Sequence, residues 1–566
     1  MPGYFSTLNT ALTALQTQKK SLDVTGHNIA NANTEGYSRQ RAVHSSTSPY
    51  HTVGMGTPTS AGQVGSGVEI TEISRMRDQF LDSQINEEKQ GQGYWEKRYE
   101  GLHRIELIFN EPSDSSLGTI MNQFWNSLQD LSNNPEDPAV RETVKQTGMT
   151  LSDTFHSLHD QLTDYQAALD DDVDTMVREI NSIVGRIADL NTQIVELKGS
   201  GKNPNDLLDK RDMLVEDLNK IVNVQSRVDQ RGNMTVTLGG VSMVSYDNTN
   251  DLEFDGDNIF FNMDSDDPAE YDAGTDILAQ IENGQLRGIL DVRTHDIDTY
   301  LGRLNELAST FAEEFNTVHH AGYDYEGNTG EDFFVGDSTG TINAETIYIA
   351  NDILNDINKI AAGELVDNPG VAKVNNINEN IPDIEGYSYD FNVTHNTGDT
   401  YDYTITEYDQ DGNPTATPLT GSYTLGDPEI DTGGHFSAQL QFVLEGEGDA
   451  SISYDPVLGT GNGDNATKLA NVIKKDKIFS NENASMLDYY KTTISTIGVE
   501  GQRADQMVSN QSVLVDQLNN QRISVSGVSL DEEMSNMIQY QQAYNAASKV
   551  VVTIDEMLNS LIGIIG

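Results

Sequence analysis

Apolar residues at both ends of the chain recur at helical spacing. Near the N-terminus they follow steps of three and four, with Lys19 filling one position of the stripe: Phe5, Leu8, Leu12, Leu15 and Leu22. Near the C-terminus the steps alternate four and three: Tyr540, Tyr544, Ala547, Val551, Ile554, Leu558 and Leu561. Each pattern places its apolar side chains on one stripe of a helix, and the second is a heptad seam. Two such seams at opposite ends of one chain are expected to pack together.

Neither terminal helix is expected to be stable alone. An isolated helix of this length is marginal in water, whereas burying one large apolar side chain contributes roughly 1.5–3 kcal/mol. Each seam therefore needs the other seam or neighbouring copies of the chain. Periodicity alone leaves two alternatives open, a helical hairpin that closes an ordinary domain and a surface for assembly. Lys19 is the exception in its stripe, since a buried lysine is costly unless its amine reaches water or an acid.

Further helices are predicted between the ends from apolar steps of three and four. They begin near residue 78 and include segments around 117–131, 140–197, 207–221, 297–318 and 487–518. One extra residue between Leu169 and Val173 indicates a place where the helix unwinds or breaks. A turn at 199–204 brings the next helix back antiparallel. These segments predict a long, coiled-coil-like helical rod.

Alternating patterns mark strands. A short strand is predicted to begin at Val68, after a linker rich in Ser, Thr, Gly and Pro. Met234, Val236 and Leu238 alternate with threonines between glycines, which is typical of a strand bounded by turns. The acidic segment that follows residue 323 also alternates in several places, which predicts a mainly-β insertion facing solvent.

The predicted fold class is α+β and multidomain, with mainly-β domains inserted into a helical rod built by the N- and C-terminal parts. The predicted divisions are 1–50, an assembly helix and turn motif; 51–90, a linker and short strand; 91–222, the helical rod, completed by 465–524; 223–290, a β segment; 291–322, a helix; 323–464, the acidic outer insertion; and 525–566, the C-terminal assembly helix, which forms the inner coiled-coil domain with 1–50.

The charge is large and unevenly spread. Among 566 residues there are 34 Lys and Arg against 89 Asp and Glu, for a net charge of −55. Residues 1–60 carry four basic and two acidic residues, net +2, whereas 323–460 carry 26 acidic residues and two lysines, net −24. Such a chain would repel the phosphates of nucleic acid, which excludes that class of partner. Salt screens repulsion between acidic copies, so the composition favours a salt-tolerant source.

Other function classes lack their residues. The sequence has no cysteine, so disulfides, thiolate catalysis and cysteine-ligated metals are excluded. It has no apolar run of 18 residues, so no membrane insertion is expected. No charged region followed by an apolar core and a cleavage site is visible at the N-terminus, so no classical signal peptide is expected.

Candidate sites for chemistry fail on spacing. His156 and His159 share a helix face but lack a further ligand, so exposed or packing roles are favoured for them. His27 lies in the terminal turn, where capping or assembly contacts are favoured over catalysis. Two loops begin like calcium loops, Asp324 to Asn328 and Asp409 to Asn413, but neither has the Glu that such a loop needs at its twelfth position. No catalytic residue, cofactor or metal is therefore predicted.

The segments beside the two seams carry a resemblance. Residues 21–41 read SLDVTGHNIANANTEGYSRQR, and residues 527–562 read GVSLDEEMSNMIQYQQAYNAASKVVVTIDEMLNSLI. Together they resemble the paired terminal signatures of flagellar axial proteins, and the form that closes on Tyr37 is most similar to the hook-associated protein 1 family. Segments 204–222, 319–334 and 459–470 also resemble that family. Four residues of the first segment are turn formers that are expected to end the helix and redirect the chain: Asn28, Asn31, Asn33 and Gly36.

The resemblance implies a structural subunit of the bacterial flagellum that joins hook to filament, and not an enzyme. It implies export by the flagellar export apparatus without a cleaved signal peptide, an extracellular location, and ordering of the terminal helices in a helical assembly. The implied partners are copies of the chain, hook protein, a further hook-associated protein, and an export chaperone at the C-terminal helix. Two alternatives stay open: another axial subunit, from hook or distal rod, and a secreted binding protein that uses the acidic insertion.

Overall fold

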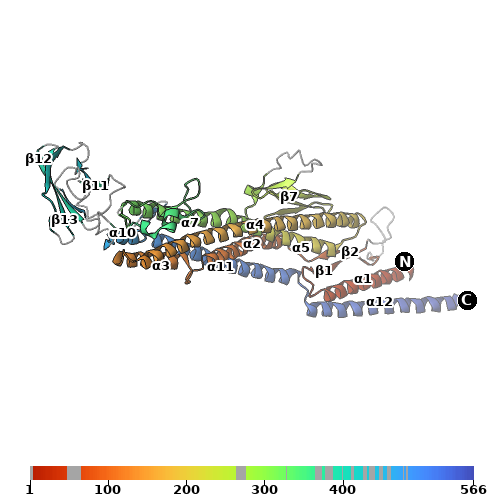
Figure 1. Ribbon diagram of the computed structural model, residues 1–566. Helices are drawn as coiled ribbons and strands as arrows, with labels where there is room; N and C mark the ends of the chain where they lie inside the picture. The colour runs from red at the N-terminus through yellow and green to blue at the C-terminus, as the bar shows by residue number, and fades with distance from the viewer. Residues whose placement is uncertain are drawn as a thin grey trace. The chain divides into compact units, whose positions relative to one another are not determined.

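The computed structural model describes residues 4–47, 65–262, 276–326, 328–363, 372–376, 387–397, 400–409, 413–424, 430–431, 440–444, 450–454, 461–475, 477–479 and 482–565. The chain divides into two units, each built from separate stretches (Figure 1). Unit 1 comprises Met1–Leu102, Ala167–His295 and Gly501–Gly566, and unit 2 comprises His103–Gln166 and Asp296–Glu500. These boundaries fall inside helical segments, at positions other than the divisions predicted from the sequence.

Three long helices contribute residues to both units: α2 (Gln79–Phe109), α4 (Pro138–Gly199) and α11 (Met486–Ser526). Of the two outcomes predicted near Leu169, local unwinding and a break, the break does not occur, because α4 is continuous and both Leu169 and Val173 are buried. The extra residue is thus absorbed without ending the helix.

The two ends of the chain form an antiparallel pair in unit 1. Figure 1 shows α1 (Tyr4–Ala30) and α12 (Leu530–Ile565) side by side, with both chain ends at the same end of the pair. We call this pair the terminal hairpin. Beside it, β1 (Gln40–Ser46) pairs antiparallel with β2 (Val68–Arg75). The sequence predicted β2 but not β1, whose residues had been included in the turn motif.

The rest of unit 1 packs a small sheet and short helices beside the long ones. Its helical elements are α5 (Asn205–Ile221), η1 (Leu278–Gln280), α6 (Gln285–Asp291) and a π-helical turn, η2 (Val292–Asp296). Its strands are β3 (Gln225–Val228), β4 (Met234–Leu238), β5 (Val241–Ser245) and β6 (Asn248–Thr249), which form one antiparallel sheet, and β7 (Asp251–Phe254) with β8 (Ile259–Asn262), which form another. The predicted alternation is confirmed, since Met234, Val236 and Leu238 are buried.

A buried asparagine anchors this sheet on α4. The Asn191 Nδ2 group donates to the carbonyl oxygens of Met234 and Tyr246 at 2.8 and 3.0 Å. Its Oδ1 accepts from the Met234 N–H at 3.0 Å and from Arg211 Nη1 at 2.9 Å. Because Asn191 is fully buried, these four bonds leave its amide satisfied and fix the sheet on the helix.

Unit 2 packs helices around a cluster of aromatic rings. Its helices are α3 (Leu117–Asn133), α7 (Ile297–His320), α8 (Asn351–Asn355), η3 (Ile357–Lys359) and α10 (Asp464–Val472). Five phenylalanine rings that lie 4.9 to 6.1 Å apart in most pairs fill its centre, and all are essentially buried: Phe124, Phe311, Phe315, Phe333 and Phe334. Rings in tilted and edge-on pairs at this spacing add to the gain from burial.

The strands of unit 2 confirm the predicted β character of the acidic insertion. They are β9 (Phe334–Val335), β10 (Tyr348–Ile349), β11 (Ala372–Asn376), β12 (Tyr387–Thr397), β13 (Thr400–Asp409), β14 (Leu419–Thr424), β15 (Ile430–Asp431), β16 (Leu440–Leu444), β17 (Ala450–Tyr454), β18 (Lys477–Phe479) and β19 (Glu482–Ala484). The largest sheet has the order β14-β13-β12-β17 and is antiparallel throughout. The α+β multidomain fold class predicted from the sequence is confirmed.

Candidate assembly interface

The predicted seam residues lie on the terminal hairpin. Of these residues Ile554 is buried, at 3% exposure, and Ala11, which the sequence did not place in the seam, is buried at 6%. Seven of the predicted residues are half-buried: Leu8, Leu15, Leu22, Tyr540, Ala547, Val551 and Leu558. Leu12 and Tyr544 are exposed, and so is Lys19, which therefore avoids the cost of burial. Phe5 and Leu561 belong to the two helices, but their side chains lie outside what the structure describes.

The terminal hairpin does not cover its own apolar surface. Six apolar side chains of α12 are 45 to 55% exposed: Leu530, Met534, Ile538, Val550, Val552 and Met557. At 100° per residue, the first three and Val552 fall on one side of the predicted seam, and Val550 and Met557 fall on the other. An exposed apolar patch of this kind marks a surface that another molecule can cover.

The turn after α1 is shaped by a single glycine. The chain leaves helix at Ala30, turns over residues 31–36, and passes Gly36 with a φ of +74°. A Cβ at Gly36 would also collide with the Met213 Sδ atom on α5. Of the four predicted turn formers, Asn31, Asn33 and Gly36 lie in this turn. The prediction for Asn28 is wrong, because it lies in the last helical turn and its side chain serves another purpose.

Asn28 connects the two sides of the turn with the start of α12. It is 1% exposed. Its Nδ2 group donates to the Gln40 carbonyl oxygen at 2.9 Å and to Glu533 Oε2 at 3.0 Å. Its Oδ1 accepts from the Tyr37 hydroxyl at 2.8 Å and from the Gln40 N–H at 3.0 Å. No donor or acceptor of this amide is left over, so the side chain has one orientation that satisfies all of its partners.

Arg39 ties the turn to the first residues of α12. Its guanidinium lies 2.7 Å from Glu533 Oε1 through Nη2 and 2.9 Å from Glu532 Oε2 through Nη1. The Arg39 N–H also donates to the carbonyl oxygen of Ser526, the last residue of α11, at 2.9 Å. Glu533 is 2% exposed, so its carboxylate has lost its contact with water, and the hydrogen bonds from Arg39 and Asn28 replace that contact.

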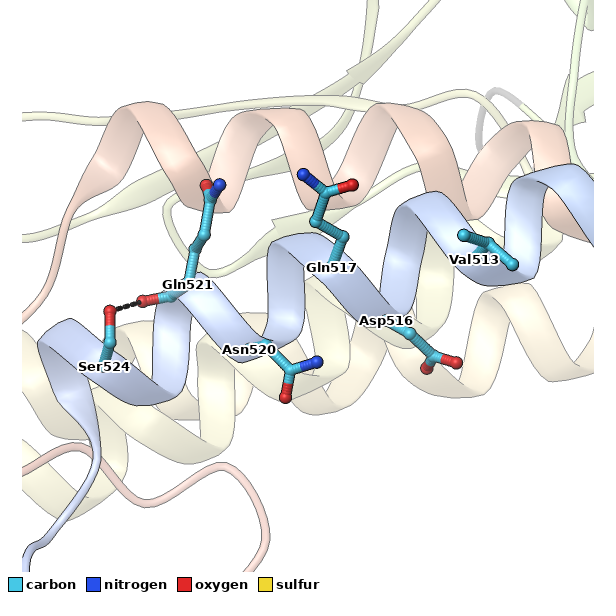
Figure 2. Close-up of a pocket in the computed structure, with 6 residues that line it drawn as sticks. All are labelled: Val513, Asp516, Gln517, Asn520, Gln521 and Ser524. Carbon is cyan, nitrogen blue, oxygen red and sulfur yellow. Dashed lines mark hydrogen bonds between the residues drawn. The ribbon is translucent and has the colours of Figure 1, made fainter.

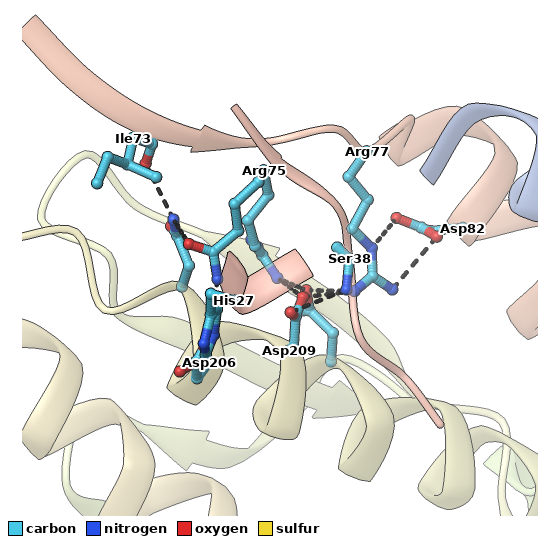
Figure 3. Close-up of polar contacts among 11 residues, drawn as sticks. His27, Ser38, Ile73, Arg75, Arg77, Asp82, Asp206 and Asp209 are labelled. Atoms are coloured by element: carbon cyan, nitrogen blue, oxygen red, sulfur yellow. Dashed lines mark hydrogen bonds and ion pairs between the residues drawn. The ribbon is translucent and has the colours of Figure 1, made fainter. Parts of the chain in front are cut away.

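The same turn is fixed to α5 by acidic residues. The Ser38 N–H donates to Asp209 Oδ2 at 3.0 Å, and Gln40 Nε2 donates to Asp206 Oδ1 at 2.9 Å. Arg75 Nη1 lies 2.8 Å from both Asp209 and Asp212. Figure 3 shows Ser38, Arg75, Asp206 and Asp209 close together between the turn, the end of β2 and α5, with Arg77, which pairs with Asp82, beside them.

We call this set the junction network: Asn28, Tyr37, Ser38, Arg39, Gln40, Arg75, Arg77, Asp206, Asp209, Asp212, Glu532 and Glu533. Burial raises the pKa of the Tyr37 phenol well above its ordinary value, and the nearby carboxylates of Asp206, Asp209 and Glu533 raise it further. The hydroxyl therefore stays protonated and donates to Asn28. The His27 ring stands edge-on to Tyr37 at 5.5 Å, and its Nε2 lies 3.2 Å from Asp206. The prediction that His27 lies in the turn is wrong, because it belongs to the last helical turns of α1.

Sequence reasoning named Asn28 and Tyr37 but missed the charged members of the junction network. Asp206 and Asp209 lie in segment 204–222, which resembles the family, on a helix that the sequence predicts to pack. Two carboxylates one turn apart on such a helix were a usable signal that cations would meet them.

A shallow groove runs along one face of α11 in unit 1. Figure 2 shows the six side chains that line this open groove of about 620 Å³: Val513, Asp516, Gln517, Asn520, Gln521 and Ser524. All of them come from one helix, and the Ser524 hydroxyl donates to the Gln521 carbonyl oxygen at 2.6 Å. An open face of a single helix lacks the enclosing walls of a small-molecule site.

The histidine and acidic candidates form no metal site in the described part of the chain. His156 packs on the Tyr348 ring at 4.6 Å, and His159 Nε2 lies 4.0 Å from Glu345. In the first calcium-like loop, Asp324 Oδ1 accepts the N–H groups of Glu326 and Asn328, both at 2.9 Å, as in an ordinary turn. Residues 410–412 of the second loop lie outside the described residues. Among the described helices, none combines the length and apolarity that crossing a membrane requires.

Two family models of known proteins match the two ends of the chain. The flagella basal body rod protein family model matches residues 8–37, and the flagellar basal body rod FlgEFG protein C-terminal model matches residues 519–564. These ranges include α1 with its turn and α12. Both helices of the terminal hairpin thus resemble the terminal segments of flagellar axial proteins.

Longer matches narrow the class. The model of the flagellar hook-associated protein FlgK helical domain matches residues 102–334. The chain is 30% identical to flagellar hook-associated protein 1 of Bacillus subtilis (strain 168) over 593 residues, which cover 100% of this chain and 99% of the relative. It is 29% identical to flagellar hook-associated protein 1 of Escherichia coli (strain K12), covering 99% and 100%. The chain belongs to the flagellar hook-associated protein 1 family, whose members are structural flagellar proteins and not enzymes.

A solved structure has the same fold. The flagellar hook junction protein FlgK from Burkholderia pseudomallei superposes with a TM-score of 0.58 at 17% identity, covering 78% of this chain and 100% of that one.

Proposed function

We propose that this chain is an adaptor that joins the flagellar hook to the filament and co-assembles with neighbouring axial subunits through its terminal hairpin. The observation that carries the proposal is the exposed apolar surface of α12, which lies on both sides of the α1 contact. Covering it would contribute roughly 25 cal/mol for each Å² removed from water. An apolar surface on two sides fits a subunit with a neighbour on each side, as in a ring or helical array.

The junction network gives such contacts a fixed geometry. Arg39 and Asn28 hold the start of α12, while Asp206 and Asp209 hold the turn that follows α1. Both helices of the terminal hairpin are therefore fixed at the same end. Neighbours that bind the exposed side chains then meet two helices whose base cannot shift.

The proposed assembly interface comprises the seam and turn residues predicted from the sequence: Phe5, Leu8, Leu12, Leu15, Leu22, Asn28, Asn31, Asn33, Gly36, Tyr37, Tyr540, Tyr544, Val551, Ile554, Leu558 and Leu561. Its partners are further copies, hook protein on one side and another hook-associated protein on the other. Before assembly, an export chaperone covers the C-terminal helix. The flagellar export apparatus delivers the chain outside the cell without a cleaved signal peptide, and the insertion at 323–464 faces solvent. Family membership and the names of the relatives support this placement.

The test is a pair of matched variants. Ile538→Asp places a carboxylate on the exposed surface of α12, whereas Val228→Asp does so at an exposed β-branched residue of β3 in the same unit. Purified chains are mixed with hook protein polymers, and binding is measured by co-sedimentation and electron microscopy. We expect Ile538→Asp to abolish binding and Val228→Asp to leave it unchanged. Equal binding by both variants would refute the proposal.

A further inference from the structure

The surface proposed for assembly differs in charge from the rest of the chain. Residues 4–22 of α1 and 534–554 of α12 contain three lysines and no acidic residue. These lysines, Lys19, Lys20 and Lys549, are all exposed. Since the whole chain has a net charge of −55 and these two stretches carry +3, the remaining residues carry −58.

Two of the carboxylates that border this acid-free surface pair with a cation, while Asp23 and Asp555 border it at its other ends. Glu532 and Glu533 come directly before residue 534, and both pair with Arg39, at 2.9 and 2.7 Å. The exposed apolar residues Met534, Ile538 and Val552 therefore lie on a helix that carries no unpaired acid between Glu533 and Asp555. Contact between two such surfaces brings few carboxylates together, so most of the electrostatic repulsion between two copies comes from the rest of each molecule.

That repulsion is large. Repulsion between like-charged copies grows with the square of the net charge, and in salt it falls as the ionic strength rises, because screening acts over about 8 Å at 0.15 M and about 3 Å at 1 M. Hydrophobic contact between terminal hairpins does not depend on net charge. The balance between the two terms is therefore set by salt.

We propose that ionic strength controls the association of copies of this chain. At low salt, repulsion between the acidic residues outside the terminal hairpin keeps two copies apart. At high salt this repulsion is screened, and the terminal hairpins of two copies bind one another. The proposal rests on the proposed function, in which the terminal hairpin is the assembly surface. It adds a condition that the assembly must meet, and it gives the acidic composition a regulatory consequence.

The experiment measures association of the full chain by sedimentation velocity between about 0.05 and 2 M NaCl. One variant reverses six exposed aspartates of α3 and α4 to lysine: Asp130, Asp153, Asp164, Asp171, Asp172 and Asp189. The matched control changes the same six to glutamate and keeps the charge. The reversal changes the net charge from −55 to −43, and since repulsion scales with its square, the salt midpoint of association should fall by about four-tenths.

The expected result is salt-induced association of the wild-type chain, a lower midpoint for the lysine variant and an unchanged midpoint for the glutamate variant. Equal midpoints for both variants would overturn the proposal, because salt would then act on apolar contacts alone. Association at the lowest salt would overturn it as well. Ile538→Asp tests the assembly surface separately from its control by salt. If this variant stays monomeric at every salt concentration, the terminal hairpin is the assembly surface whatever the midpoints show. If it associates like the wild-type chain, the proposed function fails too.

Discussion

Removing either partner of the ion pair between Arg39 and Glu533 should cost stability, because Glu533 is buried. Glu533 is 2% exposed, and both Nε and Nη2 of Arg39 lie within 2.9 Å of its Oε1. Arg39→Met would leave the carboxylate with Asn28 as its remaining side-chain partner, and an uncompensated buried charge costs about 3–5 kcal/mol. Glu533→Gln removes the charge instead, and Arg39 keeps its pair with the exposed Glu532, so we expect a cost of about 1–2 kcal/mol.

The double variant gives the sharper test. With both charges gone, no buried carboxylate is left without a cation, so Arg39→Met/Glu533→Gln should be more stable than Arg39→Met alone. The coupling between the two sites is then about 2–3 kcal/mol. The quantity to measure is the local opening free energy of the start of α12, from hydrogen exchange of peptides that cover residues 528–545.

A surface pair provides the control. Arg178 pairs with Asp174 on α4, also in unit 1, with side chains 69% and 50% exposed. Arg178→Met should cost less than about 1 kcal/mol, because water screens such a pair. The reasoning that a buried ion pair holds the start of α12 would be refuted by two results together. The free-energy costs of Arg39→Met and Glu533→Gln would sum to the cost of the double variant, and each would be as small as the cost of Arg178→Met.

Three further predictions concern single residues. Burial lowers the pKa of His319 to about 4, and its two ring nitrogens bond to the Glu331 carbonyl oxygen and the Ala361 N–H, so the unfolded chain, with a pKa near 6.5, binds the proton more readily. Unit 2 should therefore keep its full stability above pH 6.5 and lose about 3 kcal/mol of its free energy of unfolding as the pH falls to 4 and below. Unfolding measured over this pH range should show no such dependence in His319→Gln. The control variant His320→Gln, at an exposed histidine, should keep the dependence. Gly36→Ala should destabilise the turn by more than Gly201→Ala, since both have φ near +75° but only Gly36 faces a collision, and proteolysis between residues 30 and 40 reports the difference. Ile554→Ala should raise the exchange of α12 amides by an amount equivalent to about 2–4 kcal/mol, whereas Val552→Ala, at an exposed position, should leave monomer exchange unchanged.

The sequence was a good guide wherever apolar periodicity decides the structure. The spacing of Leu8 to Leu22 and of Tyr540 to Leu558 predicted both helices and their pairing, because an apolar stripe must be covered by another element. Periodicity gave no information on polar partners that lie far apart in sequence. Asn28 and Glu533 are separated by 505 positions, and Asn28 looked like a turn residue because asparagine favours turns locally. Its buried, fourfold-bonded place in α1 follows from tertiary contacts that no local rule contains.

The two kinds of contact in the terminal hairpin divide its stability along its length. At the base, Arg39 and Asn28 fix Glu533, and the turn is bonded to Asp206 and Asp209. Further along α12, Ile554 is the one buried side chain among the described positions after Glu533. Opening of a helix is easiest where buried contacts are few, so protection should decrease from the base towards the chain ends. Neighbouring subunits would then order the outer turns on binding, at a cost in conformational entropy that covering the apolar side chains of α12 must offset.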